Sequence, residues 1–279
     1  MKYYERNGEV EVTGVSDFNL ERIFECGQCF RWDADENGVY TGVAFGIAAR
    51  IYRFGESVFI SGTIHEFESV WMDYFDLSRD YSAIRRKLCI DDFMKKATTH
   101  GAGIRILRQD KWEALCSFII SQCNNIPRIK SIISTFCKEF GAPIALGGET
   151  YYSFPSAQTV ANLDADKLSP LRCGYRAQYI ITAAKAVASG KLDLDAISLG
   201  SPDAAKAELK KLHGVGDKVA DCVLLFGLNM LDAFPVDVWM KRALSEHFEK
   251  GFDYKIFSPY AGVAQQYIFH YVRNVKPLL

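Results

Sequence analysis

The residues best suited to chemistry lie around a lysine that follows a pair of glycines late in the chain. The segment His213-Gly-Val-Gly216 ends one predicted helix, and a second, apolar helix is predicted over Asp217–Leu228. Lys218 falls in the first turn of the second helix, where the helix dipole disfavours a cation by roughly 0.3–1 kcal/mol. Partial burial at such a position favours the neutral amine, which is a nucleophile, whereas the alternative is a solvated surface lysine. Cys222 stands four residues further on, on the same helix face.

The same pair of glycines is suited to binding a phosphate group. Gly214 and Gly216 allow backbone conformations with positive φ and leave the amides at the start of the second helix uncovered. Free amides and the helix dipole together favour an anion without requiring a basic surface. The alternative is that Gly214 only ends the first helix before a tight turn.

A carboxylate stands at the start of the next predicted helix. Phe234-Pro-Val-Asp237 leads into a helix predicted over Val238–Phe248. Asp237 is therefore expected to cap this helix by accepting amide hydrogen bonds, a role worth ~1 kcal/mol. A capping carboxylate that faces a pocket also stays ionised and stabilises a cation that forms nearby.

The composition, with 49% hydrophobic and 24% charged residues among 279, excludes disordered, collagen-like and membrane classes. The net charge is −1, so binding to nucleic acid must depend on local groups. No apolar run approaches the ~18 residues of a membrane helix, and no signal peptide is evident. We therefore expect an intracellular protein that is not secreted, has no membrane partner and keeps its eight cysteines reduced. Cys26 and Cys29 have no second pair at zinc-ligand spacing, so no metal site is predicted.

The hydrophobic pattern predicts an α+β protein with two domains. Residues 1–97 read as an antiparallel β-rich domain and residues 98–279 as a mostly helical domain, with the first strands and the last helix free to pack across the boundary. The predicted strands are Glu9–Thr13, Val39–Val43, Ile47–Arg53 and Val58–Ser61, with one short helix at Asp17–Glu25. Helical periodicity begins near Ile64, and its clearest segments include Trp112–Cys123, a helix with Pro127 in its first turn that stops at Gly141, a short helix opened by Ser156, Arg176–Ser189 and a helix opened by Pro202.

The glycine–lysine segment and the residues around Asp237 together resemble a known family. Leu212-His-Gly-Val-Gly-Asp-Lys-Val-Ala-Asp-Cys222, followed by Pro235-Val-Asp-Val238, is similar to the helix-hairpin-helix DNA glycosylase superfamily, and within it to the 8-oxoguanine DNA glycosylases. The C-terminal four-cysteine cluster of the iron–sulfur members is absent. Further blocks occur in the family's order: Cys26–Trp32, Tyr74–Leu77, Ile104–Arg108 with Trp112, Ser117–Ile126, Gly174–Ala177 and Pro259–Gln265.

This resemblance implies roles for residues around an extruded base. It makes Lys218 the nucleophile that forms a Schiff base with C1′ of the sugar, and Asp237 the residue that supports the sugar cation. It makes Gly27 the glycine whose carbonyl accepts the N7–H that 8-oxoguanine has and guanine lacks. The remaining base contacts that it implies are a sandwich of Cys222 and Phe269 and contacts from Gln265 and Pro235.

The resemblance also implies contacts to the DNA outside the base pocket. Arg128 and Arg176 match the arginines that read the opposite cytosine, Tyr175 matches the wedge at the bent step, and Asn124 lies in the loop that enters the vacated stack. The hairpin residues His213, Gly214 and Gly216 are expected at the DNA backbone.

Three positions depart from the family pattern. Cys123-Asn-Asn125 replaces the three consecutive asparagines of the animal members, which predicts a weaker requirement for cytosine. Trp239 stands where a phosphate-contacting histidine is usual, and Val272 where its acidic partner would be. Both members of the pair are replaced together, and the resemblance places Trp239 at the DNA by position alone.

The resemblance therefore predicts a bifunctional 8-oxoguanine DNA glycosylase and AP lyase that acts opposite cytosine in double-stranded DNA. We expect a monomer without metal or cofactor, located in the cytoplasm or nucleoid of a bacterium or the nucleus of a eukaryote. One alternative is a monofunctional alkyl-base or adenine glycosylase of the same fold, which would use Asp237 without a lysine nucleophile. Another is a non-catalytic damage-binding module that uses the hairpin only to hold phosphate.

Overall fold

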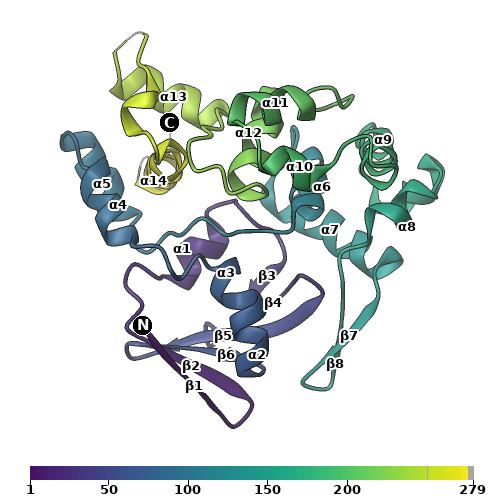
Figure 1. Ribbon diagram of the computed structural model, residues 1–279, viewed down its shortest axis with the longest axis horizontal. Coiled ribbons are helices and arrows are strands. Elements are labelled where there is room, and N and C mark those ends of the chain that lie inside the picture. Colours follow the sequence, from purple (N-terminus) through teal and green to yellow (C-terminus); the bar gives the residue numbers. More distant parts are fainter. Residues whose placement is uncertain (250, 276–279) are drawn as a thin grey trace.

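The computed structural model describes residues 1–249 and 251–275, which form an antiparallel sheet beside a larger body of helices (Figure 1). The six strands lie in the order β1-β2-β6-β5-β4-β3, and every neighbouring pair is antiparallel. The four predicted strands are present, as β2, β4, β5 and β6. The bounds are β1 Lys2–Arg6, β2 Glu9–Thr13, β3 Trp32–Ala34, β4 Tyr40–Ala44, β5 Ile47–Phe54 and β6 Ser57–Ser61.

One face of the sheet is covered by short helices and an aromatic cluster. Val10, Val12 and Ile60 alternate with more exposed residues along their strands and are buried. Phe24 stacks on Trp32 with 4.5 Å between ring centroids, and both belong to this core. The helices here are α1 Leu20–Glu25, which starts after its N-cap Asn19 rather than at Asp17, α2 Ile64–Glu66, the π-helix η1 Phe67–Trp71 and α3 Met72–Tyr74.

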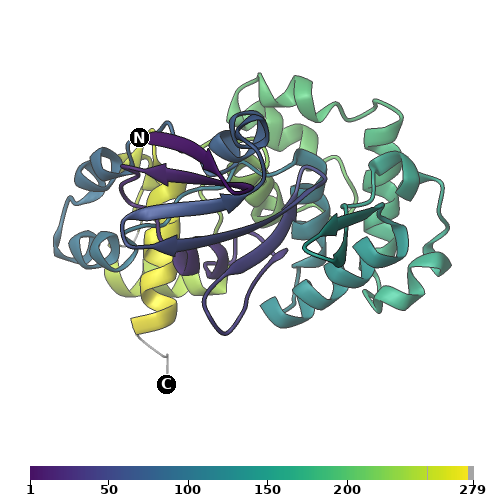
Figure 2. The same ribbon diagram turned by 90° about the horizontal axis from the view of Figure 1, so that it is seen from below.

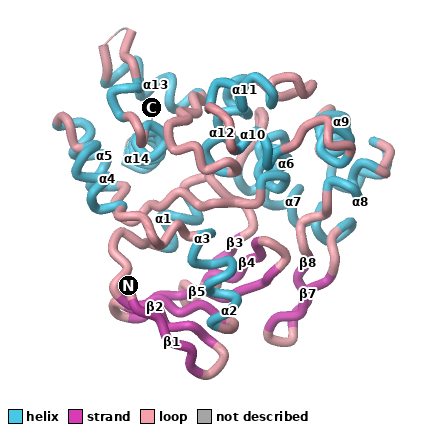
Figure 3. Tube along the Cα trace, viewed as in Figure 1, coloured by secondary structure: helices cyan, strands magenta, loops and turns pink. Residues whose placement is uncertain are grey.

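The rest of the described chain is mainly helical and has its own hydrophobic core. Figure 3 shows the strands in the lower part of the molecule, with α2 and α3 beside them and most of the other helices above. The helices are α4 Tyr81–Leu88, α5 Asp92–His100, α6 Lys111–Ile120, α7 Ile126–Phe140, α8 Ala157–Ala161, η2 Ala165–Leu171, α9 Arg176–Ala188, α10 Leu194–Ser198, α11 Pro202–Leu209, α12 Asp217–Phe226, α13 Val238–His247, η3 Tyr254–Phe257 and α14 Ala261–Val275.

One hairpin interrupts the helical body where only helices are expected. β7 Pro143–Leu146 pairs antiparallel with β8 Glu149–Tyr152 through a turn at Gly147 and Gly148. Both glycines have positive φ, 60° and 84°, as a tight two-residue hairpin turn requires. The hairpin contacts β5 and so lies beside the sheet (Figure 1).

The two parts pack closely, because residues of each lie in the hydrophobic core of the other. In the view of Figure 2, α14 runs behind the strands of the sheet. α4 and the first part of α5 precede the predicted boundary at residue 97, yet Ile84 and Met94 belong to the helical core. Cys26 and Phe30 from the first part also lie in that core, and Leu107 lies in the core of the sheet. The exact domain boundary stays a prediction. Within the described residues, no helix is both long and apolar enough to cross a membrane.

A fully buried amide joins the two parts. Gln28 Nε2 donates to the carbonyl oxygens of Ile23 at 2.9 Å and Arg105 at 2.8 Å, and its Oε1 accepts from Leu107 N at 2.9 Å. The backbone carbonyl of Gln28 accepts from Gln109 Nε2 at 2.7 Å. These bonds fasten the turn that contains Gly27 to the segment that leads into α6.

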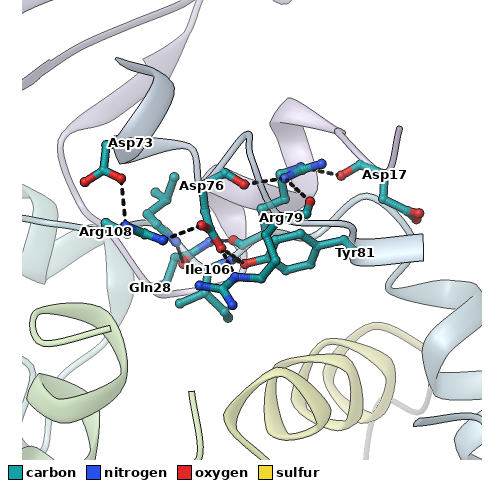
Figure 4. Close-up of polar contacts among 10 residues, drawn as sticks. Asp17, Gln28, Asp73, Asp76, Arg79, Tyr81, Ile106 and Arg108 are labelled. Carbon is teal, nitrogen blue, oxygen red and sulfur yellow. Dashed lines mark hydrogen bonds and ion pairs between the residues drawn. The ribbon is translucent and has the colours of Figure 1, made fainter. Parts of the chain in front are cut away.

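A buried carboxylate organises the same segment (Figure 4). Asp76 has no exposed side-chain surface, pairs with Arg79 and Arg108, and accepts a hydrogen bond from Tyr81 Oη at 3.0 Å. Burial and this carboxylate raise the pKa of Tyr81 well above its ordinary value. The phenol therefore stays protonated and also accepts from Ile106 N at 3.0 Å.

We predict that Asp76→Asn lowers the free energy of unfolding by about 2 kcal/mol, because the fully buried side chain loses its charge-assisted hydrogen bonds with the partly exposed Arg79 and Arg108. Asparagine tolerates the left-handed φ of 48° at this position, so the loss reports on charge rather than on backbone strain. Asp73 pairs with the same Arg108 at 2.7 Å but is 69% exposed, and Asp73→Asn is expected to cost less than about 1 kcal/mol. Urea unfolding of both variants measures the difference, and equal losses would contradict the role of Asp76.

Candidate active site

A cavity of about 600 Å³ opens where the Gly27 turn, the loop between α6 and α7, and helices α12, α13 and α14 meet. These segments are far apart in the sequence. Nine of the residues singled out from the sequence line this cavity: Gly27, Asn124, Lys218, Cys222, Pro235, Asp237, Trp239, Gln265 and Phe269. The fold therefore brings together the residues expected to surround a base.

Lys218 is half-buried in the first turn of α12 and lines the cavity. Its Nζ donates to Ser121 Oγ at 3.2 Å and lies 5.4 Å from the centroid of the Phe118 ring. Within residues 1–249 and 251–275, its Nζ forms no ion pair with a carboxylate. The amine is thus held by a neutral hydroxyl and remains available to an electrophile in the cavity.

Asp237 has the capping role expected of it. Its side chain accepts a hydrogen bond from Met240 N at 2.8 Å at the start of α13. It is half-buried and also lines the cavity, so one carboxylate both caps a helix and faces the space beside Lys218. An ionised carboxylate there stabilises positive charge that develops in the cavity.

Cys222 and Phe269 form part of the cavity wall from two different helices, α12 and α14. Burial raises the pKa of Cys222 to about 11, although Lys218 acts in the opposite direction. The thiol is therefore uncharged at neutral pH and offers a small apolar surface. A neutral thiol and an aromatic ring suit the two faces of a planar base.

The Gly27 turn requires glycine for its backbone. Its φ is +82°, where a side chain is strained. A Cβ at this position would lie 3.6 Å from Ile126 Cδ1, 3.8 Å from Phe269 Cε1 and 3.9 Å from Arg273 Nη1. The turn is therefore packed directly against the cavity walls.

The helix-hairpin-helix element consists of α11, the turn with its two glycines, and α12. Gly214 has φ +86°, and a Cβ there would stand 2.3 Å from Tyr179 Cδ2, so only glycine fits. Gly216 is the N-cap of α12 and supplies no side-chain hydrogen bond to the first-turn amides. Those amides remain available to an anion. His213 is exposed beside this turn, with its ring edge-on to Tyr179.

The residues expected to contact the DNA outside the cavity differ in how exposed their side chains are. Tyr175 is 54% exposed at the start of α9, and Arg128 is exposed at the start of α7. Arg176 is only 7% exposed, and its guanidinium donates to the carbonyl oxygens of Gln122, Cys123 and Cys173. It holds the loop that carries Asn124, and its contact with cytosine stays a prediction.

Trp239 and Val272 occupy different environments. Trp239 lines the cavity from the first turn of α13, whereas Val272 is buried in the helical core. An indole and a buried valine cannot form an ion pair, so the replaced histidine–acid pair has no equivalent at these two positions.

Four residues of this region have no individual role predicted from the sequence: Gln28, Ser121, Gln266 and Arg273. Gln266 and Arg273 line the cavity from α14. Arg273 follows Phe269 by four residues, so helical spacing could have placed both on one face. The roles of Gln28 and Ser121 depend on contacts between distant segments, which no local pattern reveals.

No cluster of three or more His, Cys, Asp or Glu side chains suited to a metal ion occurs within the part of the chain that the structure describes. All eight cysteines are free thiols.

A helical hairpin beside a cavity with a lysine and a carboxylate is the arrangement of the helix-hairpin-helix DNA glycosylases. A family model described as HhH-GPD superfamily base excision DNA repair protein matches residues 116–251. A second model, described as 8-oxoguanine DNA glycosylase, N-terminal domain, matches residues 12–115. The chain belongs to the 8-oxoguanine DNA glycosylase family.

Individual relatives agree with this assignment. The N-glycosylase/DNA lyase of Saccharomyces cerevisiae is 33% identical over 260 residues, which cover 84% of this chain and 69% of the yeast protein. The solved structure of MBOgg1 with a low-affinity DNA ligand is 42% identical, with a TM-score of 0.94 and 99% of both chains covered. The 8-oxoguanine glycosylase/lyase of Clostridium acetobutylicum, solved with double-stranded DNA containing cytosine opposite 8-oxoguanine, is 38% identical, with a TM-score of 0.93 and coverage of 99% and 98%. The predicted family, α+β fold class and DNA glycosylase/lyase class are confirmed.

The two hairpin glycines make a matched test of the DNA-binding role. Gly214→Ala is expected to lower the free energy of unfolding by at least about 2 kcal/mol, because it combines positive φ with a clash against Tyr179. Gly216 has φ −96°, and a Cβ at this position would lie in open space, so Gly216→Ala should lower the free energy of unfolding by less than about 1 kcal/mol. Its methyl group would nevertheless stand at the helix end, and the affinity for DNA should fall about tenfold.

Thermal unfolding and titration of a labelled duplex measure the two effects separately. Wild-type affinity in Gly216→Ala would show that the start of α12 does not contact the DNA backbone.

Proposed function

We propose that this protein removes 8-oxoguanine from duplex DNA where the lesion is paired with cytosine, and then cuts the strand at the resulting abasic site. The observation that carries the proposal is the position of Lys218 in a cavity that also contains Asp237 and is walled by Cys222 and Phe269. Base excision with strand cleavage requires a nucleophilic amine, a carboxylate and apolar groups on both faces of the base, and the Cys222 thiol and the Phe269 ring are such groups.

The damaged base must leave the stack before the amine can reach it, at a cost of a few kcal/mol. We propose that Tyr175 fills the vacated space together with the loop around Asn124, and that Arg128 and Arg176 pair with the orphan cytosine. The backbone amides at Gly214 and Gly216, with His213 beside them, hold the DNA backbone, and Trp239 lies against the DNA next to the cavity.

Lesion recognition follows from hydrogen-bond satisfaction. The carbonyl of Gly27 accepts the N7–H of 8-oxoguanine, whereas guanine presents a lone pair at N7 and would place two acceptors face to face in a dry pocket. Pro235 and Gln265 add contacts to the same base. The penalty therefore falls on the undamaged base.

The chemistry uses a single nucleophile. Lys218 Nζ attacks C1′, and the electron pair of the glycosidic bond leaves with the base, which takes up a proton. Nζ then loses one proton, and its lone pair expels the ring oxygen O4′, which takes up a proton as the ring opens. The product is an iminium between Nζ and C1′ that keeps one proton on nitrogen. The iminium acidifies C2′–H, and loss of this proton expels the 3′ phosphate by β-elimination. Asp237 stabilises the positive charge on the sugar throughout.

We further propose that the enzyme acts as a monomer without metal or cofactor, in the compartment that holds the DNA. That compartment is the cytoplasm and nucleoid in a bacterium, or the nucleus in a eukaryote.

Borohydride trapping tests the nucleophile. The wild type should form a covalent adduct with a duplex containing 8-oxoguanine, because reduction of the iminium makes the bond between Nζ and C1′ permanent. Lys218→Gln should form no adduct. The control variant Lys185→Gln removes an exposed lysine from the last turn of α9, and it should form the adduct as the wild type does. Equal trapping by Lys218→Gln would remove the assignment. Wild-type binding without cleavage would favour a damage-binding module, and base release without an adduct a monofunctional glycosylase.

Four duplexes that place 8-oxoguanine opposite each base test the partner specificity. Single-turnover excision should be fastest opposite cytosine, and Arg128→Ala should reduce that preference about tenfold, because an arginine–base pair contributes roughly 1–3 kcal/mol of discrimination. The matched variant Arg86→Ala, which removes an exposed arginine from α4, should keep the preference. An unchanged preference for cytosine in Arg128→Ala would argue against the proposed contact between Arg128 and the opposite cytosine.

A further inference from the structure

A serine at the end of α6 lies beside the amine of Lys218. Ser121 follows the last residue of α6 and lines the cavity. Lys218 Nζ donates to Ser121 Oγ at 3.2 Å, and Ser121 Oγ in turn donates to the carbonyl oxygen of Phe118 at 2.8 Å. These two bonds together determine what the hydroxyl can do for the amine.

The proton of the Ser121 hydroxyl is directed away from Lys218. A serine hydroxyl has one proton to donate and two lone pairs that accept. The proton of Ser121 goes to the Phe118 carbonyl, so the hydroxyl meets Lys218 as an acceptor. A hydroxyl that donated to a neutral amine would occupy the lone pair that attacks the substrate. A hydroxyl that accepts an N–H leaves this lone pair free.

The ring of Phe118 adds a second attraction for the amine. Lys218 Nζ is 5.4 Å from the ring centroid, and the face of an aromatic ring attracts N–H groups. A neutral amine has two N–H groups and one lone pair. When the N–H groups are directed to the Ser121 oxygen and the Phe118 ring, the lone pair faces away from α6, toward the cavity that Lys218 lines.

The surroundings of Ser121 hold its hydroxyl in place. The Phe118 ring is buried and stacks on Phe226 with 5.3 Å between ring centroids. On the other side of Ser121, the carbonyl oxygen of Gln122 accepts from Arg176 Nε at 2.9 Å. The serine therefore lies between a packed helix and an anchored loop, and its oxygen occupies a defined position before any substrate binds.

We propose that Ser121 is a positioning residue for the nucleophile, which accepts one N–H of Lys218 and so directs the lone pair of the neutral amine toward C1′ of the extruded nucleotide. The inference rests on the function proposed above and specifies what orients its nucleophile. No proton passes between the two side chains. The effect is one of orientation, because a displacement of about 1 Å at a reacting group slows a reaction by up to about 100-fold.

Helix α10 offers a matched control for this arrangement. Ser198 Oγ donates to the carbonyl oxygen of Asp195 at 2.6 Å and accepts from Lys111 Nζ at 3.0 Å. This is the bonding pattern of Ser121, but Ser198 belongs to a different part of the surface and does not line the cavity that contains Lys218.

The experiment measures bond formation and DNA binding separately. Single turnovers with saturating enzyme report excision of 8-oxoguanine, and a duplex with a tetrahydrofuran abasic analogue, which has no leaving group at C1′, reports affinity. Ser121→Ala removes the acceptor, so excision and borohydride trapping should both slow about tenfold, while the affinity stays within about twofold of wild type. Ser198→Ala should match the wild type in all three measurements.

Two further variants separate the hydroxyl from the space that it fills. Ser121→Thr keeps the hydroxyl, whereas Ser121→Val has nearly the same shape without it. Both side chains are β-branched, so any strain at the end of α6 is common to both. Excision by Ser121→Thr should stay within about threefold of wild type, and excision by Ser121→Val should be as slow as in Ser121→Ala.

The outcomes distinguish positioning from a structural role. Equal rates in Ser121→Thr and Ser121→Val would overturn the inference, and so would a loss of affinity in Ser121→Ala as large as its loss of rate. In both cases a wild-type adduct through Lys218 would leave the proposed function standing. Wild-type protein that forms no adduct overturns both.

Discussion

The buried side chain of Gln28 supports the whole site, because it holds the Gly27 turn where the helical body needs it. Gly27 lies between α1 and the sheet in the chain, yet it lines a cavity formed mainly by α12, α13 and α14. Three hydrogen bonds of Gln28 connect this turn to the segment before α6, a fourth ties it to α1, and Asp76 anchors the same segment through Arg108. Fully satisfied buried polar groups of this kind specify one arrangement of the parts.

Polar groups at the cavity, in contrast, have fewer hydrogen-bond partners among the described residues. The donors of Arg176 and Gln28 bond to protein carbonyls, whereas Lys218 Nζ donates to the neutral hydroxyl of Ser121. α12 begins without a side-chain cap, and Gln266 Oε1 has no hydrogen-bond partner among the described residues. Unsatisfied groups cost stability in the free protein. The amine of Lys218 and the first-turn amides of α12 lie at or beside the cavity, and a flipped nucleotide would offer them an electrophilic carbon and phosphate oxygens.

Sequence patterns predicted the elements whose apolar residues repeat clearly. Helix α7, with Pro127 at its start and Gly141 at its end, and strand β2 lie where periodicity placed them. Strand β1 was missed because its exposed residues show little alternation in burial, and the β7–β8 hairpin because its Gly147-Gly148 turn lies within an otherwise helical region. Arg176 was expected at the DNA, but its environment depends on carbonyls from a loop more than 50 residues away.

The sequence by itself determined the helical hairpin, the lysine at the start of α12 and the capping aspartate of α13, because glycine conformation, helix position and N-cap chemistry are local properties. It also carried the family resemblance, through motifs spread along the chain. Only the tertiary structure decided that Ser121 is a partner of Lys218, that Gln28 fastens the Gly27 turn, and that the side chains of Gln265 and Gln266 bond to each other. These facts depend on which distant groups meet in a buried space, and hydrogen-bond satisfaction there is a property of the whole packing rather than of any one segment.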